Sequence, residues 1–139
     1  FRTSWVYSSF GHNFVKTMLR YGAERGALRV VNDQIGSPTY ARDIARMTLE
    51  WIQSGKAAQH SGLFNYSNEG VCSWYDFAQA IFELSGVKCK VEAIPSTEYP
   101  TPAARPHYSV LDKGKFKAAF GLDIPYWRDS LRGCLSLLA

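Results

Sequence analysis

The sequence lacks long hydrophobic runs and contains few cysteines. No apolar stretch approaches the roughly 18 residues that a membrane span requires, and the first residues form no charged-then-apolar leader. We therefore expect neither a membrane span nor a signal peptide. The three cysteines, Cys72, Cys89 and Cys134, form no CxxC pair and are odd in number, so we expect buried thiols and no disulfide framework. A reducing, cytoplasmic setting fits these absences best.

Positive charge is only mildly in excess. Sixteen Lys and Arg against twelve Asp and Glu give a net charge of +4. No basic run concentrates this charge, so nucleic acid is not an expected partner. The chain has 139 residues, of which 46% are hydrophobic and 20% charged, which is an ordinary globular composition. We expect a single domain over residues 1–139.

Several catalytic motifs are also missing. There is no HExxH, GxSxG or P-loop motif, and no two glycines are spaced as GxG, so the dinucleotide-binding fingerprint is absent. Short-chain reductases use a Tyr-x-x-x-Lys pair, but none of the eight tyrosines has a lysine four residues later. His12, His60 and His107 have no second ligand at i+3 or i+4, so no metal site is expected. Hydride transfer by this chain alone is not expected.

What the sequence contains is an alternation of strand-like and helix-like segments. Apolar residues at helical spacing predict helices over 12–25, 40–54, 73–85 and 113–120, each of which is followed by a glycine. The same spacing predicts a last helix from Pro125 onward, because proline is common in the first turn of a helix. Aromatic and β-branched residues predict strands over 2–7, 28–31, 62–66 and 89–94. Segments 32–38 and 95–106 are expected to be loops, the second because it holds four prolines. This alternation indicates the α/β class.

Each predicted helix has one apolar face that we expect to be buried. In the helices over 12–25 and 40–54 these residues are Phe14, Val15, Met18 and Leu19, and Ile44, Met47, Trp51 and Ile52. In the helix over 73–85 and the last helix they are Trp74, Phe77, Ala78, Ile81 and Phe82, and Trp127, Leu131, Cys134, Leu135 and Leu138. Ser73 and Asp76 are spaced as a near capping box.

The chain begins inside a predicted strand and without a methionine, which suggests a piece of a longer protein. A strand over 1–7 that had lost its sheet would expose backbone groups and apolar side chains. We therefore expect this segment to pack back on its own domain or to pair with a second copy, which would give a homodimer.

Four features are candidates for a binding site. Trp5 ends the first predicted strand, where α/β proteins place ligands, although a core tryptophan would look the same. Asn13 and Phe14 open a helix after a glycine turn, where amides can meet a phosphate, although helix capping also explains them. Residues 32–39 offer several hydrogen-bonding groups, as surface loops do. Arg105 stands in the proline-rich segment, which suits a diphosphate or an ordinary surface arginine.

Six motifs in succession resemble the dTDP-4-dehydrorhamnose reductase family, which belongs to the extended short-chain dehydrogenase/reductases. They are RTSWVY at 2–7, GHNFVKTML at 11–19, DQIGSPT at 33–39, WYDFA at 74–78, the run from ARP to SVLD at 104–112, and PYWRDSL at 125–131. The resemblance covers essentially the whole chain.

The resemblance implies a fold and an activity. A complete enzyme of this family holds NADPH or NADH in a Rossmann domain and a dTDP-sugar in a C-terminal domain. It reduces dTDP-4-dehydro-L-rhamnose to dTDP-L-rhamnose for cell-surface polysaccharide. This chain would be the C-terminal substrate-binding portion, with residues 1–25 a remnant strand and helix of the Rossmann domain. The glycine-rich loop and the Tyr-x-x-x-Lys pair would lie upstream, so the chain alone would be inactive and would bind no cofactor.

The resemblance also implies roles for particular residues. Trp5 matches the substrate-contacting tryptophan of the family, whose indole gives an apolar wall and one N–H donor. Arg105 would face the diphosphate. The other residues assigned to the sugar nucleotide are Asn13, Phe14, Gln34 and Ser37. Thr3 and Ser4 would lie on the cofactor side.

Two departures and two other functions remain open. His12 stands where relatives often carry Asn, and nothing in the sequence shows the magnesium site through which some relatives dimerise. One rival function is a regulatory subunit of the same fold, like the β subunit of methionine adenosyltransferase, which needs no turnover. The other is an epimerase or dehydratase of the superfamily, for which the motif at 2–7 is unusual.

Overall fold

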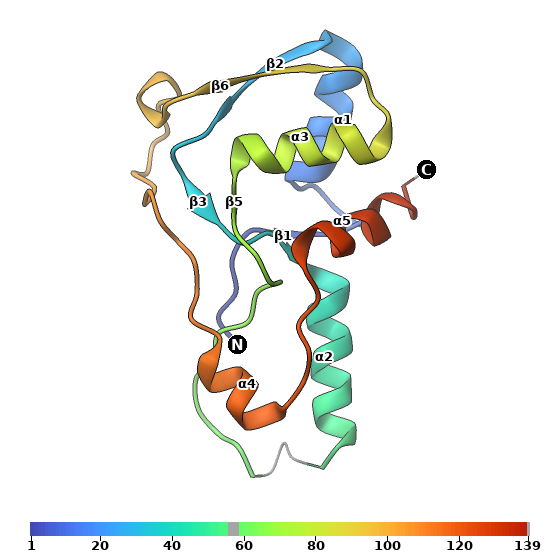
Figure 1. Cartoon of the computed structure of the whole chain (residues 1–139), viewed down its shortest axis with the longest axis vertical. Helices are drawn as coiled ribbons and strands as arrows, with labels where there is room; N and C mark the ends of the chain where they lie inside the picture. Colours follow the sequence, from blue (N-terminus) through green and yellow to red (C-terminus); the bar gives the residue numbers. More distant parts are fainter. Residues whose placement is uncertain (56–58, 139) are drawn as a thin grey trace.

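The computed structural model describes residues 1–55 and 59–138 (Figure 1). Its helices are α1 (Phe14–Arg25), α2 (Ala41–Gln53), α3 (Trp74–Ser85), α4 (Gly114–Phe120) and α5 (Trp127–Leu135), with a 3-10 turn, η2 (Ser96–Glu98). Its strands are β1 (Val6–Tyr7), β2 (Ala27–Val31), β3 (Ile35–Gly36), β4 (Thr39–Tyr40), β5 (Cys72–Ser73) and β6 (Lys90–Ile94).

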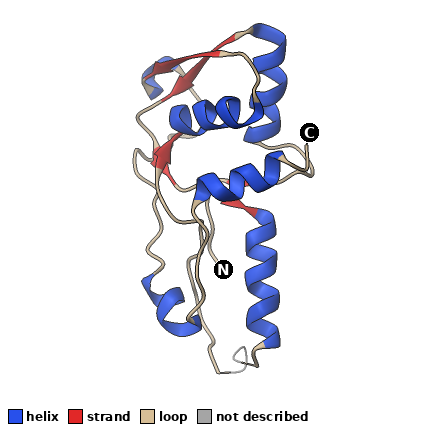
Figure 2. Ribbon diagram, turned by 45° about the vertical axis from the view of Figure 1, so that its right-hand side comes forward, coloured by secondary structure: helices blue, strands red, loops and turns tan. Residues whose placement is uncertain are grey.

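In the described part of the chain, the strands form three separate pairs. β2 pairs with β6 in parallel, β1 pairs with β4 in parallel, and β3 pairs with β5 antiparallel. The β2–β6 pair lies at one end of the molecule, and α4 and the far end of α2 lie at the other (Figures 1 and 2). Because α1 leads into β2 and α3 leads into β6, and both helices pack against this parallel pair, the α/β class is confirmed.

The larger hydrophobic core lies among α1, α3 and α5 and the strands beside them. The apolar faces predicted for these helices are confirmed, because their central residues are almost fully buried. These residues are Val15, Met18, Phe77, Ala78, Ile81, Phe82, Trp127, Leu131, Cys134 and Leu135. Asn13 and Ser73 cap α1 and α3, and Ser73 and Asp76 form the predicted capping box.

A second core joins α2 to α4. Its buried residues are Met47, Phe64, Tyr66, Phe116, Phe120 and Ile124. The ring of Phe1 packs against the rings of Trp51 and Phe116, with centroids 5.5 and 6.2 Å apart. The expected burial of Ile52 is wrong, because this side chain is 56% exposed near the end of α2.

The predicted strands over 2–7 and 62–66 are both wrong in extent. Only Val6 and Tyr7 form β1, because Trp5 interrupts the extended segment with a φ of +49°. Arg2 and Asn65 make an isolated parallel bridge, and no longer strand forms there. The N-terminal segment therefore pairs with its own chain, through this bridge and through β4.

Three further boundaries differ from the predictions. The loop expected over 32–38 contains β3, whose partner β5 lies directly before α3. Pro125 lies before the last helix, which begins at Trp127, so this proline is not a first-turn residue. Leu138 follows the end of that helix, where it packs half-buried against the larger core.

Other expectations concern thiols, metals and membranes. All three cysteines are free. Cys72 and Cys134 are buried as expected, whereas Cys89 is only half-buried. Burial raises the pKa of the Cys134 thiol to about 11. Within residues 1–55 and 59–138, no three His, Cys, Asp or Glu side chains gather as a metal site. None of the helices in these ranges is both long enough and apolar enough to cross a membrane.

Asn68, a fully buried residue, links α2 to the start of α5. Its Nδ2 group donates to the Asp43 carboxylate at 2.8 Å, to the Ser130 hydroxyl at 3.0 Å and to the Pro125 carbonyl at 3.2 Å. Its Oδ1 atom accepts from the backbone N–H of Tyr40, the N-cap residue of α2, at 2.8 Å. Each polar group of this amide thus satisfies a buried partner.

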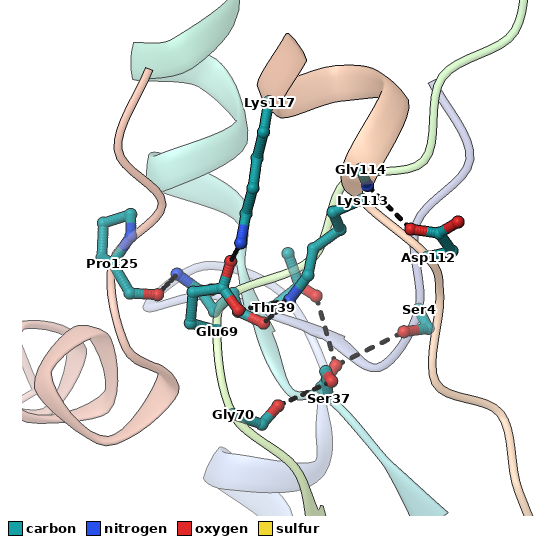
Figure 3. Close-up of polar contacts among 11 residues, drawn as sticks. Ser4, Ser37, Thr39, Glu69, Gly70, Asp112, Lys113, Gly114, Lys117 and Pro125 are labelled. Atoms are coloured by element: carbon teal, nitrogen blue, oxygen red, sulfur yellow. Dashed lines mark hydrogen bonds and ion pairs between the residues drawn. The ribbon is translucent and has the colours of Figure 1, made fainter. Parts of the chain in front are cut away.

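The next residue, Glu69, connects the starts of α4 and α5 (Figure 3). Its backbone exchanges hydrogen bonds with Pro125 and Trp127. Its carboxylate lies 3.0 Å from the Nζ of Lys113 and 2.6 Å from the Nζ of Lys117. Burial alone would raise the pKa of Glu69, but these two ammonium groups outweigh it and lower the pKa.

Replacing Asn68 with Ala should destabilise the fold strongly. The substitution leaves the Asp43 carboxylate short of a donor and the Tyr40 N–H without an acceptor, which should lower the free energy of unfolding by about 2–4 kcal/mol. Urea unfolding measures this change. Asn65→Ala is the matched control, because the Asn65 side chain makes one exposed hydrogen bond, to the Asp112 carbonyl. We expect this control to cost under about 1 kcal/mol, and equal costs for the two variants would contradict the account.

Candidate functional site

A pocket of about 250 Å³ lies at the carboxyl end of β2. This is the edge of a parallel strand pair where α/β proteins commonly place ligands. α1 contributes Phe14 and Met18, β2 contributes Arg29, Val30 and Val31, and the first residue of α3 contributes Trp74. The loops that follow β2 and β6 complete the lining with Gln34, Tyr99, Thr101 and Arg105.

Of the residues predicted from the sequence, the pocket brings together Phe14, Gln34 and Arg105. These three are distant in sequence and come from a helix and two loops. Their convergence agrees with the assignment of all three to one ligand. The contact of each with a ligand stays a prediction.

Trp5 reaches this pocket through Trp74. The two indoles stack with centroids 3.5 Å apart and planes 7° apart. Trp74 also contacts the ring of Phe14, at a centroid distance of 4.7 Å. Trp5 is half-buried, packs against the larger core and forms one end of a row of three aromatic rings.

A backbone segment fixed on both sides carries Arg105. Before it, the Asp33 carboxylate accepts hydrogen bonds from the Ser96 N–H at 3.0 Å and from the Ser96 hydroxyl at 2.9 Å. After it, the His107 carbonyl accepts from the N–H of Ile35 at 2.8 Å. The Ser96 N–H is the main reason that the pKa of Asp33 lies below its usual value. We refer to residues 95–109 as the strap.

The pocket combines an apolar wall with two cations. Phe14, Trp74 and Val30 provide ring and aliphatic surface, while the guanidinium groups of Arg29 and Arg105 provide positive charge. Arg29 forms an ion pair with Glu98 of the strap, and both side chains are about half exposed. A ligand with a flat apolar part and an anionic part matches this lining.

Asn13 is used as a helix cap. Its Oδ1 atom accepts from the Lys16 N–H at 3.3 Å, and its Nδ2 group donates to the Ser8 carbonyl at 2.7 Å. It does not line the pocket. The capping explanation is therefore confirmed, and a contact between Asn13 and a ligand stays a prediction.

Ser37, Ser4 and Thr3 also lie outside this pocket. Ser37 is fully buried, and its hydroxyl donates to the Gly70 carbonyl at 2.8 Å (Figure 3). The Ser4 hydroxyl donates to the Ser37 carbonyl at 3.4 Å, and Thr3 is exposed. Contacts of Thr3 and Ser4 with a cofactor, and of Ser37 with the sugar nucleotide, stay predictions.

Sequence reasoning missed several lining residues. Trp74 and Met18 were expected only as core residues, because a helical stripe does not distinguish a core contact from a pocket wall. The sequence could have indicated Arg29, since a cation within a strand of apolar residues is unusual. It could not have indicated Tyr99 or Thr101, because only the folded strap brings them close to β2.

Comparison with known proteins gives a consistent result. The family model described as RmlD substrate binding domain matches residues 1–139. The dTDP-4-dehydrorhamnose reductase of Escherichia coli K12 is 42% identical over 145 residues, covering 99% of this chain and 48% of that protein. The chain thus spans about half the length of the curated relatives it matches.

Solved structures agree with the sequence match. A dTDP-4-dehydrorhamnose reductase from Clostridium acetobutylicum superposes with a TM-score of 0.90 at 42% identity, covering 99% of this chain and 47% of that chain. The Bacillus anthracis enzyme, solved in complex with NADP, superposes with a TM-score of 0.90 at 39% identity, covering 98% and 47%. This chain belongs to the RmlD substrate-binding domain family.

Proposed function

We propose that this chain is the C-terminal, sugar-nucleotide-binding part of a dTDP-4-dehydrorhamnose reductase. The complete enzyme would reduce dTDP-4-dehydro-L-rhamnose to dTDP-L-rhamnose, in the cytoplasm, for a cell-surface polysaccharide. The pocket that gathers Phe14, Trp74 and Arg105 in a chain of this family carries the proposal. The family match supports the substrate-binding role, and the named relatives support the reaction.

The lining suits the two ends of a nucleoside diphosphate. The rings of Phe14 and Trp74 can pack against a pyrimidine, and Gln34 can form hydrogen bonds to its polar edge. Arg105 can bind diphosphate oxygens with two N–H groups at once. The sugar would then extend toward Trp5, at the end of the aromatic row.

The hydride would come from NADPH or NADH, which delivers it to the keto carbon when bound elsewhere in the complete enzyme. The chain itself has no Tyr-x-x-x-Lys pair to supply a proton. Its own contribution is to hold the sugar nucleotide and to exclude water from one side of it. We accordingly propose that the chain alone does not catalyse the reduction and binds no cofactor.

The dTDP-sugar is the one partner that the pocket supports. Neither nucleic acid nor a membrane is part of the proposal, and a homodimer stays a prediction. No feature of the described residues favours the regulatory-subunit function. The epimerase and dehydratase functions are not favoured either, because several relatives of 42% to 45% identity are named dTDP-4-dehydrorhamnose reductase.

Arg105→Ala should weaken the binding of dTDP to this chain by about tenfold or more, because the diphosphate loses a charge-assisted pair of hydrogen bonds. Isothermal titration with dTDP measures the loss. Binding to the unmodified chain should itself be weak, since few walls enclose the ligand. Arg132→Ala is the control, because Arg132 is exposed and pairs with Asp129. Equal affinities for the Arg105 variant and the control would contradict the proposal, as would no binding to the unmodified chain.

Asp33→Ala should loosen the strap and weaken dTDP binding by about threefold to tenfold, because Arg105 is no longer held beside the pocket. Amide hydrogen exchange at Ser96 should accelerate in the same variant. Asp123→Ala, at an exposed position, is the control. Unchanged exchange at Ser96 would contradict the role of Asp33.

The pH dependence of the strap follows from the lowered pKa of Asp33. The carboxylate contributes fully above the usual Asp pKa of about 3.9. The contribution is lost as the pH falls through the lower, folded-state value. The difference in Ser96 exchange between Asp33→Ala and the unmodified chain should therefore be large at neutral pH and vanish in acid. If the difference in Ser96 exchange instead increased at acidic pH, the role of the Asp33 carboxylate would be contradicted.

A further inference from the structure

Trp5 adopts an unusual backbone conformation. Its φ of +49° is the only positive value at a non-glycine residue in the described ranges. A side chain with a Cβ atom rarely occupies this left-handed region, and it stays there only where the surroundings hold it. The contacts around Trp5 must therefore fix this residue.

Backbone contacts fix one side of Trp5. Its carbonyl accepts a hydrogen bond from the N–H of Thr39 at 3.1 Å, and the following residues pair with β4. Close packing fixes the ring. A Cβ atom at Gly36 would lie 2.4 Å from the Cε2 atom of the Trp5 indole, so only glycine leaves room for this ring.

The stack on Trp74 fixes the plane of the indole. Trp74 is itself held in place, because it is the first residue of α3 and follows β5 directly. β5 pairs with β3 at Gly36, and the Ser73–Asp76 capping box fixes the start of the helix. The β3–β5 pair and the start of α3 therefore place the Gly36 backbone and the Trp74 ring against Trp5.

We propose that Trp74 is the positioning residue for Trp5 in the sugar-nucleotide site. Trp74 lines the pocket on one side and stacks on Trp5, so it sets where the Trp5 indole stands relative to a bound nucleotide. The Trp5 indole N–H makes no hydrogen bond to the described residues and is not among their buried unpaired groups, so it is available to a ligand. The inference rests on the proposed function and extends it to recognition of the sugar.

The first test needs no ligand. In the unmodified chain, the indole N–H of Trp5 should give a single sharp nuclear magnetic resonance signal, assigned by its absence in Trp5→Phe. Trp74→Leu removes the flat ring, and Gly36→Ala displaces the indole by a separate route. Both should broaden or split the signal; a shift alone does not count, because removing a stacked ring changes the ring-current shift even if the indole stays in place. Trp74→Phe keeps a ring in the stack and should retain a single signal. Gly133→Ala, where a Cβ meets nothing within 4 Å, is the matched control.

The second test measures how much the sugar adds to binding, as the ratio of the dissociation constants of dTDP and dTDP-L-rhamnose. Trp74→Leu should reduce this ratio by about threefold to tenfold, as expected for one aromatic contact. Trp74→Phe should largely restore it. If Trp74 only stabilised the fold, its replacement would lower the free energy of unfolding and leave this ratio unchanged.

The outcomes separate the two proposals. A single, sharp Trp5 signal in Trp74→Leu overturns the positioning role, whatever the ligand data show. An unchanged ratio in the presence of a broadened signal also overturns it. If the unmodified chain binds neither nucleotide, the proposed function fails, and the indole signal alone decides whether Trp74 positions Trp5.

Discussion

The parallel pairing of β2 with β6 is the constraint on which the site depends. The ladder runs from Ala27 opposite Lys90 to Val31 opposite Ile94, so it joins segments far apart in sequence. α1 leads into β2 and α3 into β6, and both helices pack against this pair. At the carboxyl end, β2 continues to Gln34 and β6 continues into the strap. One ladder therefore places the helix walls and both loops around the same pocket.

An element can be predicted from the sequence when the residues within it carry the pattern, and it cannot when it forms only through contacts with distant residues. Helices with a long apolar stripe and a stopping glycine, such as α3, are predicted well, and the four prolines over 95–106 predict that this segment is neither a long helix nor a strand. The two-residue strands β3 and β5 were not, because such short pairings have no periodicity and exist only through tertiary contact. Trp5 shows the same limit: its residue type predicted a strand, but packing on Gly36 and Trp74 turns its backbone out of the extended region.

The site could be predicted only in part. Arg105 was singled out by its rigid setting, Phe14 by its place at the start of a helix, and Gln34 as part of a polar loop. The resemblance then assigned all three to the sugar nucleotide, and they converge on one pocket. Arg29 and Trp74 were missed because their contribution depends on which side of an element faces the pocket. The pocket's combination of aromatic surface and guanidinium charge, and not the fold alone, supports the proposal that this chain binds a sugar nucleotide.

The central claim is that this pocket binds the nucleotide of a dTDP-sugar. Mapping amide and indole chemical shifts during a dTDP titration tests it most directly, because the map locates the ligand without any substitution. The account predicts changes concentrated at Phe14, Gln34, Trp74 and the strap around Arg105. Saturating changes confined to another surface, or none at millimolar dTDP, would contradict it.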